Sequence, residues 1–515
     1  MARVTRPAEA PAPAPLRWIP PWLAALPALY VISPLALLAL PQLRRLPHAA
    51  WWVLGFYAFS QQLPALFSPE PLLASLLALV RTLLMLGLIG VGVSLRQSER
   101  LRWLGIGLMV VYVTALVFSG LSGADPFSSR LSHPYMTPIT LGLAGAVGIW
   151  LALFAGGKLL WRVPLGLLGL GVLLLSGSRG PLAAALVGCV AGFIIRRGWR
   201  LALGVLVGAV LLAGGFYLGK KLEVAAITRL GNADTTGRDI VWYNTLSVIR
   251  SEPLSGVGSY LLGQRLAPPG DNCELWMAAN GTAPSCPPWV KKLGSPWLIA
   301  HNIALQQLAE TGPLGLLGLF VLLGAVVTAV FQNRNPLGLA VISGLLVATA
   351  NDNTLLVPSP FFAEVFWVAA GAQLLRLAPT SLGAVGGWAA GLMLALSFPL
   401  LASRLPAPQV RPPPSLRFLN APTQVRSPRA YTAFAQFDLP PGKYRANLRS
   451  CTDSCMPIVT IDFTAPASRQ APLLTLSGDL QPVPRQRLEL LLYVGEGSTR
   501  PTPAGRRAWN VEIKP

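Results

Sequence analysis

The sequence contains little charge and very little histidine. Only 12% of its 515 residues are charged, 53% are hydrophobic, and three are histidine. Because soluble domains carry roughly 25% charged residues, this composition excludes an ordinary water-soluble protein. Five cysteines in a chain of this length also exclude a scaffold held together mainly by disulfides. What the chain does contain is a series of apolar runs, each long enough to cross a bilayer as a helix.

The apolar runs predict an all-α polytopic membrane protein with about twelve transmembrane helices, a large extracytoplasmic loop and a C-terminal β-sandwich-like domain. The membrane domain covers residues 21–402, and the Ala- and Pro-rich residues 1–20 are expected to be disordered. We place the spans at 22–43, 49–67, 71–95, 103–120, 138–156, 163–177, 180–195, 201–218, 313–331, 336–350, 361–376 and 383–402.

The net charge of +21 would suggest nucleic-acid binding in a soluble domain, but here many basic residues lie in short connections between spans. The positive-inside rule places such connections in the cytoplasm, so we expect no nucleic-acid partner. The basic connections contain Arg44 and Arg45, residues 96–102, Lys158 and Arg162, residues 196–200, Arg334, and Arg376. The outside of the membrane would then hold residues 121–137, 176–180, 219–300, 351–360 and the tail.

The start of the chain does not fit this scheme. About twelve spans would leave the N-terminal arm outside, although it contains Arg3, Arg6 and Arg17. Two explanations stay open: the count is wrong near the start, or residues 22–43 form a signal-anchor.

Four of the five cysteines form two pairs in segments predicted to be extracytoplasmic. Cys273 and Cys286 share the loop 219–300, and Cys451 and Cys455 share the tail. Because that compartment is oxidising, we hypothesise two disulfides, Cys273–Cys286 and Cys451–Cys455. The tail contains no histidine that would complete a metal site with its cysteines, so neither a metal nor another cofactor is expected.

The composition changes after the last span, and residues 410–515 are predicted to form the β-sandwich-like domain. Alternating apolar and polar residues predict strands, and the segments between them contain turn residues. The clearest candidate strands are 431–437, 444–448, 458–463 and 488–493. An excess of basic residues favours contact with anionic glycans or lipid head groups, and an ordinary solvated surface is the alternative.

Three segments place cationic or titratable groups at the predicted outer face. Arg179 follows small residues at the boundary between two spans, and Arg238 starts a predicted helix whose amides favour an anion. His301 and Asn302 lie where the large loop ends, with Glu310 further along the same helical face. Structural explanations stay open for each: Arg179 reaching the interface, Arg238 in an ion pair, and His301 as a hydrogen-bonding residue. Arg81, in a predicted span, either pairs with Glu364 or faces a substrate cavity.

The order of these segments resembles the O-antigen ligase and polymerase family of bacterial envelope enzymes. The resemblance rests on Ser178-Arg179-Gly180, on Gly237-Arg238 with Trp242 and residues 253–258, and on His301-Asn302 with residues 310–315. It covers roughly residues 120–375 of this sequence. The tail lies outside the family pattern, which leaves the acceptor in doubt.

The resemblance implies a membrane glycosyltransferase that moves a glycan from an undecaprenyl-diphosphate carrier to an acceptor hydroxyl or amine, with inversion and without a metal. Arg179 and Arg238 would bind the diphosphate, because a guanidinium group makes paired hydrogen bonds to phosphate. His301 would be the general base, with Glu310 or Asn302 orienting it. Arg130 and Asp352 are further candidate substrate-binding residues.

Two alternatives to a ligase stay open. A polymerase of lipid-linked repeat units would use the same donor and differ in its acceptor, which for a ligase is lipid A core, another glycan, a surface polymer or a protein. A transporter or flippase of lipid-linked glycans would also need many spans and arginines, and paired half-repeats would favour it. A transporter would not need a histidine on an ordered outer loop.

Overall fold

A computed structural model describes the following residues: 16–121, 130–131, 133–195, 204, 207–208, 214, 238–266, 299–357, 359, 361–402, 415–425, 427, 431–439, 442–451, 455–465, 473–494 and 503–513. For a few of them, including Arg238, only the backbone is described. The chain divides into two compact units, which are considered separately below. The first comprises Met1–Asp234, Thr245–Leu262 and Ile299–Pro399, and the second contains the rest.

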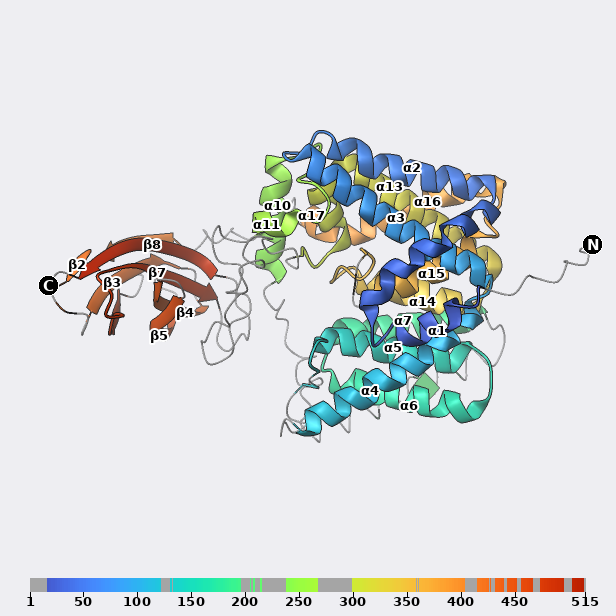
Figure 1. Ribbon diagram of the computed structural model, residues 1–515, viewed down its shortest axis with the longest axis horizontal. Coiled ribbons are helices and arrows are strands. Elements are labelled where there is room, and N and C mark those ends of the chain that lie inside the picture. Colours follow the sequence, from blue (N-terminus) through green and yellow to red (C-terminus); the bar gives the residue numbers. More distant parts are fainter. Residues whose placement is uncertain are drawn as a thin grey trace, which may run out of the picture. The chain divides into compact units, whose positions relative to one another are not determined.

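The first unit is helical (Figure 1). Its helices are α1 (Ile19–Ala25), η1 (Tyr30–Arg45), α2 (His48–Ala65), α3 (Pro71–Leu95), η2 (Ser98–Trp103), α4 (Leu104–Leu121), α5 (Pro138–Phe154), α6 (Leu159–Leu175), α7 (Arg179–Ile195), α13 (Ile303–Asn333), α14 (Pro336–Ala348), α15 (Phe362–Leu374), η4 (Pro379–Ser381) and α16 (Leu382–Leu396). The helices α10 (Arg238–Ser251), α11 (Leu262–Leu266) and α17 (Phe398–Ala402) lie at or beyond the unit boundaries.

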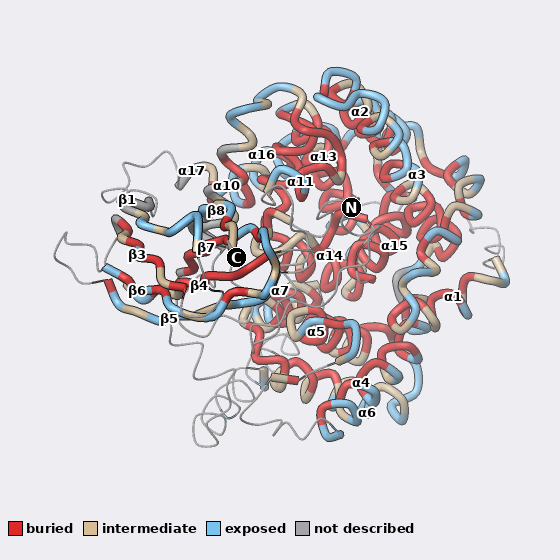
Figure 2. Tube along the Cα trace, turned by 60° about the vertical axis from the view of Figure 1, so that its left-hand side comes forward, coloured by how far each residue is buried: buried red, intermediate tan, exposed pale blue. Residues whose placement is uncertain are grey.

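The apolar helices confirm an integral membrane protein at a coarse level. Four segments among the described residues are long and apolar enough to cross a bilayer: Pro71–Leu95, Arg100–Leu121, Ile303–Asn333 and Pro379–Leu396. Five shorter apolar helices accompany them. Figure 2 shows buried residues concentrated on α13, α14 and α15, whereas α2, α3 and α6 carry many exposed ones. The predicted count of about twelve spans stays a prediction, since most of 201–218 lies outside the described residues.

The predicted first span, residues 22–43, is a hairpin of α1 and η1 instead of one continuous helix. The backbone N–H of Leu16, just before α1, donates to Ser94 Oγ near the end of α3 (3.4 Å). From there α1 leads to a turn, and Trp22 Nε1 donates to Ile32 O across the two limbs (3.0 Å). Prolines at 34 and 41 disfavour an α-helix in the second limb, which is a 3₁₀-helix.

The second limb of the hairpin, η1, runs back toward the C-terminal end of α3, where the first limb begins. Its buried Ser33, Ala36 and Ala39 recur every third residue, as three residues per turn require. Ala36 lies against Gly87 of α3 and Ala39 against Gly90, so η1 and α3 run in the same direction. In this direction η1 continues to Arg45, toward the end of α3 where Leu16 lies. Leu16 and Arg45 therefore lie at the same end of α3, which removes the conflict that the N-terminal arginines posed for the positive-inside rule.

This hairpin predicts that residues 17 and 44 are accessible from the same side of the membrane. In a variant without the five natural cysteines, Arg17→Cys and Arg44→Cys should react with a membrane-impermeant thiol reagent from one side. Phe67→Cys, which follows α2 at the other end and is 72% exposed, should react from the opposite side. Labelling of residues 17 and 44 from opposite sides would show a complete crossing.

Helices α7 and α14 pack antiparallel, and this brings two distant segments to the same end. Gly188 lies against Ala340, and Gly344 lies against Ala184, with Trp150 of α5 touching both glycines. Arg179, at the start of α7, is five residues before Ala184, and Thr349, just after α14, is five residues after Gly344. Because the helices are antiparallel, Arg179 and Thr349 lie at the same level. The backbone N–H of Ile303 donates to Thr349 O (3.2 Å), so the start of α13 lies there too.

Helix α13 is broken at Gly312, where the backbone has φ +62° and ψ −170°, directly before Pro313. Proline donates no hydrogen bond and crowds the carbonyl four residues earlier, so the turn before it leaves carbonyls without helical partners. Val257 N–H donates to Ala309 O (2.9 Å) and Gly258 N–H donates to Glu310 O (2.8 Å). The turn 253–258 thus completes the broken helix, and Gly256, at φ +66°, lets it approach the Glu310 backbone.

The second unit contains two β-sheets that share one hydrophobic core. One sheet has the order β1 (Ser415–Asn420), β3 (Tyr431–Asp438), β6 (Leu473–Gly478). The other has the order β2 (Gln424–Val425), β8 (Pro503–Ile513), β7 (Arg485–Val494), β4 (Gly442–Cys451), β5 (Cys455–Ala465). Buried side chains of β3, β4, β6 and β7 form the core. The strands predicted in the tail are present, and β1, β2, β6 and β8 are additional.

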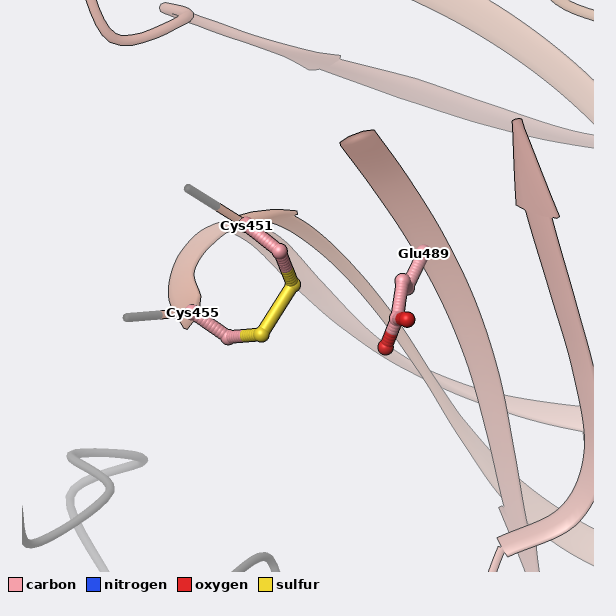
Figure 3. Close-up of side chains that lie close together, drawn as sticks. All are labelled: Cys451, Cys455 and Glu489. Carbon is pink, nitrogen blue, oxygen red and sulfur yellow. A yellow bond between two sulfur atoms is a disulfide. The ribbon is translucent and has the colours of Figure 1, made fainter. Parts of the chain in front are cut away.

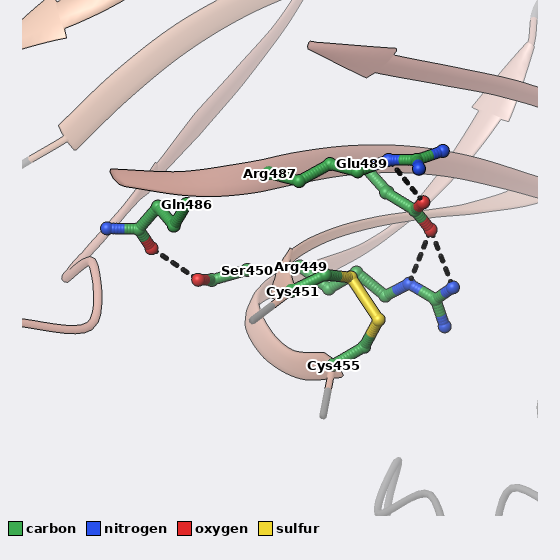
Figure 4. Close-up of a disulfide and its surroundings, with 7 residues drawn as sticks. All are labelled: Arg449, Ser450, Cys451, Cys455, Gln486, Arg487 and Glu489. Atoms are coloured by element: carbon green, nitrogen blue, oxygen red, sulfur yellow. Dashed lines mark hydrogen bonds and ion pairs between the residues drawn. A yellow bond between two sulfur atoms is a disulfide. The ribbon is translucent and has the colours of Figure 1, made fainter. Parts of the chain in front are cut away.

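The structure joins Cys451 and Cys455 in a disulfide beside a buried ion pair. Their sulfurs and the Glu489 carboxylate lie within 4.8 Å of one another (Figure 3). That carboxylate accepts from Arg449 Nη2 (2.7 Å) and faces Arg487 Nε (3.1 Å), as Figure 4 shows. With the sulfurs bonded and the carboxylate paired to two guanidinium groups, the three residues form no ligand set for a metal here. Cys273 and Cys286 lie outside the described residues.

Candidate functional site

His301 is paired with Asp352. Its Nδ1 lies 3.3 Å from Asp352 Oδ1, and the two side chains are 36% and 22% exposed. His301 has a left-handed backbone (φ +50°), an uncommon conformation for a residue with a side chain. Asn353 N–H donates to the same Asp352 oxygen (2.8 Å), which fixes the carboxylate. The imidazole is therefore held through Nδ1, and a carboxylate in this position selects the tautomer with its acceptor at Nε2.

The Asn302 side chain forms hydrogen bonds to backbone groups next to both His301 and Asp352. It is fully buried and is the N-cap of α13, with its Oδ1 accepting from Leu305 N–H (3.0 Å). Its Nδ2 donates to Ala350 O and to Leu396 O, both at 2.9 Å. The sequence suggested that Asn302 binds substrate or orients the imidazole. The structure differs, because the amide already bonds to three backbone groups and Asp352 is the partner of His301.

Arg179 is the first residue of α7 and follows a tight turn at the end of α6. The turn has Gly177 at φ +60° and buried Ser176 and Ser178. Arg130 holds this turn: it donates to Ser176 O (3.2 Å), Gly177 O (3.4 Å) and Ser178 Oγ (3.1 Å). Arg130, a candidate substrate-binding residue in the sequence, thus positions the turn that carries Arg179.

Glu310 faces Arg81 and not His301. Its Oε2 lies 2.6 Å from Arg81 Nη1, and both side chains are at most 2% exposed. The other oxygen accepts from Gln306 Nε2 (2.6 Å) and from the Tyr260 N–H (3.0 Å). The buried guanidinium group of Arg81 needs a charged partner, and Glu310 provides it. The Glu310 carboxylate therefore points toward Arg81 and away from the His301 imidazole. Arg81 does not pair with Glu364, which instead accepts from Ser33 and Ser359.

The structure thus brings Arg179, His301 and Asp352 to one end of the helices, whereas Glu310 lies deeper along α13. Arg238 begins α10, but its side chain is not described and it belongs to the second unit. The basic connections that contain Arg45, Arg96 and Arg334 lie at the opposite ends of their helices.

The other two histidines have different surroundings. His48 begins α2 at the end with the basic connections. His133 contacts Thr114 Oγ1 (3.2 Å), and partial burial lowers the pKa of its imidazole below the ordinary value. Both observations leave His301 as the histidine with a carboxylate partner.

Sequence reasoning missed Tyr260, whose ring lies under the Arg81 guanidinium group at 3.9 Å. Gln306 was assigned no role from the sequence, yet its Oε1 accepts from Ala300 N–H next to His301 (2.7 Å). The only sequence signal was proximity to the motifs. Tyr260 follows Gly258 by two residues, and Gln306 lies halfway between Asn302 and Glu310.

Part of the chain matches a known protein family. Residues 164–320 match the family model described as O-antigen ligase, a range that contains Arg179, Arg238, His301 and Glu310 and ends before Asp352. No curated protein matches the chain. Residues 164–320, less than a third of the chain, are thus similar to O-antigen ligase, and the apolar helices indicate an integral membrane protein.

Proposed function

We propose that this protein transfers a glycan from an undecaprenyl-diphosphate carrier to an acceptor hydroxyl or amine at the outer face of a bacterial cytoplasmic membrane. The observation that carries the proposal is the His301–Asp352 pair at the same end of the bundle as Arg179. A base and a guanidinium group at one membrane boundary suit a donor whose lipid stays in the bilayer while its diphosphate reaches the interface.

His301 acts as the general base. With Nδ1 held by Asp352, Nε2 takes the proton of the acceptor as the acceptor oxygen or nitrogen attacks the anomeric carbon. The bond from that carbon to the diphosphate oxygen breaks, and its electron pair leaves with the undecaprenyl diphosphate. Asp352 stabilises the imidazolium that forms, as a carboxylate partner does in other His-based sites. A single displacement of this kind inverts the anomeric configuration.

The arginines stabilise the leaving group. Arg179 is placed by the Ser176–Ser178 turn, which Arg130 holds from the neighbouring segment. A guanidinium group makes two parallel hydrogen bonds to phosphate oxygens and offsets the charge that builds up there. Arg238 is proposed as the second such group on the family resemblance alone. Because arginines supply this charge, the proposal needs no divalent cation.

Ligase activity is preferred to polymerase activity because the tail adds an ordered β domain that is suited to contact an acceptor. A transporter remains the alternative, and the His301–Asp352 pair favours transfer chemistry because a transport cycle has no need of a general base.

The proposal is tested by incubating the purified protein, with a metal chelator, with a lipid-linked oligosaccharide and separate candidate acceptors. We expect one acceptor to gain the glycan, and a nucleotide sugar should not replace the lipid-linked donor. Movement of the donor across vesicles without any transfer would support a transporter.

Arg179→Lys should lower transfer by about 10- to 100-fold, because an ammonium group keeps the charge but not the paired hydrogen bonds. The loss should be measured as kcat/KM for the lipid-linked donor. A matched control is Arg162→Lys, which sits at the other end of α6 and donates to Ala152 O and Leu153 O. Equal rates for Arg179→Lys and the unaltered protein would show that Arg179 does not bind the diphosphate and only reaches the membrane interface.

A further inference from the structure

Tyr260 links three parts of the first unit that are far apart in the sequence. Its N–H donates to Glu310 of α13 (3.0 Å), and its ring lies 3.9 Å below the Arg81 guanidinium group of α3. Its hydroxyl donates to the carbonyl of Val357. Tyr260 also has a left-handed backbone, at φ +63°, so the chain departs from its preferred conformation to make these contacts.

The segment that Tyr260 holds is the one that carries Asp352. Residues 349–357 connect α14 to α15 and contain no helical hydrogen bonds of their own beyond the first turn. Side chains fix this segment at three carbonyls: Asn302 at Ala350 (2.9 Å), Trp367 at Leu355 (2.8 Å) and Tyr260 at Val357. Loss of one anchor would allow the segment, and the carboxylate on it, to shift relative to His301.

Glu310 links both His301 and Asp352 to the buried guanidinium group of Arg81. Through Gln306 it reaches the backbone of Ala300, the neighbour of His301, and through Tyr260 it reaches the Asp352 segment. Arg81 holds Glu310 from α3, whose outward face is lined with exposed leucines such as Leu72 and Leu76. A charged pair buried in a membrane protein is costly, and here it fixes the two halves of one site.

We propose that Tyr260 is a positioning residue, which keeps Asp352 on the His301 imidazole by anchoring the segment 349–357 to the Arg81–Glu310 pair. The inference rests on the function proposed above. Tyr260 touches no reacting atom. Its effect is to maintain the distance and angle of the hydrogen bond between Asp352 and His301 Nδ1.

Tyr260→Phe tests this with the smallest change, because the ring on Arg81 and the N–H to Glu310 remain and only the hydroxyl is lost. We expect kcat for transfer to fall about tenfold while the donor KM stays within about twofold, since a small misplacement of a catalytic group is costly. Tyr112→Phe is the matched control. It removes a buried hydroxyl that donates to Ala144 O (2.6 Å) between α4 and α5, and it should leave kcat unchanged.

Two further measurements separate positioning from a general structural effect. In an Asp352→Asn background, Tyr260→Phe should cause no additional loss, because its effect passes through the carboxylate. Amide hydrogen exchange at residues 350–357 should be faster in Tyr260→Phe and unchanged in Tyr112→Phe. Full transfer by Tyr260→Phe, or a tenfold loss that persists in the Asp352→Asn background, would overturn the proposal. Unchanged exchange would overturn the anchoring itself, independently of whether His301 is the base.

Discussion

Replacing His301 by alanine is expected to reduce glycan transfer by about 100- to 10,000-fold, because this is the range that a positioned general base contributes. The donor KM should change little, since the imidazole acts on the acceptor. The measurement is single-turnover transfer from a lipid-linked oligosaccharide by the purified variant. His301→Gln, which keeps a polar side chain of similar length but takes no proton, should show the same loss.

The control for this substitution is His48→Ala, which removes a histidine from the end of α2 with the basic connections. It should transfer at the unaltered rate and elute as the unaltered protein does in size-exclusion chromatography. Transfer by His301→Ala at more than about a tenth of the original rate would remove the imidazole from the mechanism.

Asp352→Asn is expected to lower kcat by about 100-fold or more. The amide can accept a hydrogen bond from His301 Nδ1, but it does not stabilise the imidazolium and it also permits the wrong tautomer. Asn353 N–H can still donate to the new side chain, so the segment should keep its conformation. The rate should be measured by the same assay at saturating donor.

The pairing of the two residues is tested by the double variant His301→Ala with Asp352→Asn. If Asp352 works through the imidazole, the double variant should be no slower than His301→Ala alone. Multiplied losses would show that Asp352 contacts the substrate separately, which was the role considered for it from the sequence.

Much of the membrane fold was predictable because bilayer-crossing helices leave a direct signal in the sequence. The predicted span 71–95 agrees with α3, and 138–156 agrees with α5 to within two residues at its end. The predicted start at 313 corresponds to Pro313, where α13 resumes after its break. The N-terminal hairpin was not predictable, since its length and apolar character equal those of a span and only contacts with α3 show that it returns.

The sequence pointed to candidate site residues but not to the contacts between them. The ordered motifs indicated Arg179, His301 and Glu310, and helical spacing put Glu310 on the same face as Asn302. Spacing along one helix says nothing about Arg81, which is more than two hundred residues away in the chain and takes the Glu310 carboxylate. Asp352 became the partner of His301 because the start of α13 lies beside the end of α14, where Ile303 N–H donates to Thr349 O (3.2 Å).

The glycines of the 253–258 motif illustrate the same limit. In the sequence they counted only as part of the motif that carries the family resemblance. In the structure Gly256 allows the loop to approach the backbone of Glu310, and Gly258 allows it to approach the Ala74 side chain. The motif 253–258 therefore packs directly against the motif that contains Glu310. A pattern of glycines predicts close approach, but it does not specify which partner approaches.

The most direct test of the central claim is the anomeric configuration of the bond that the purified protein forms from a donor of known configuration, determined by NMR in the presence of a chelator. Direct attack by an acceptor that His301 deprotonates predicts inverted configuration in the product. Retained configuration would exclude a single direct displacement by the deprotonated acceptor and would contradict the proposed mechanism.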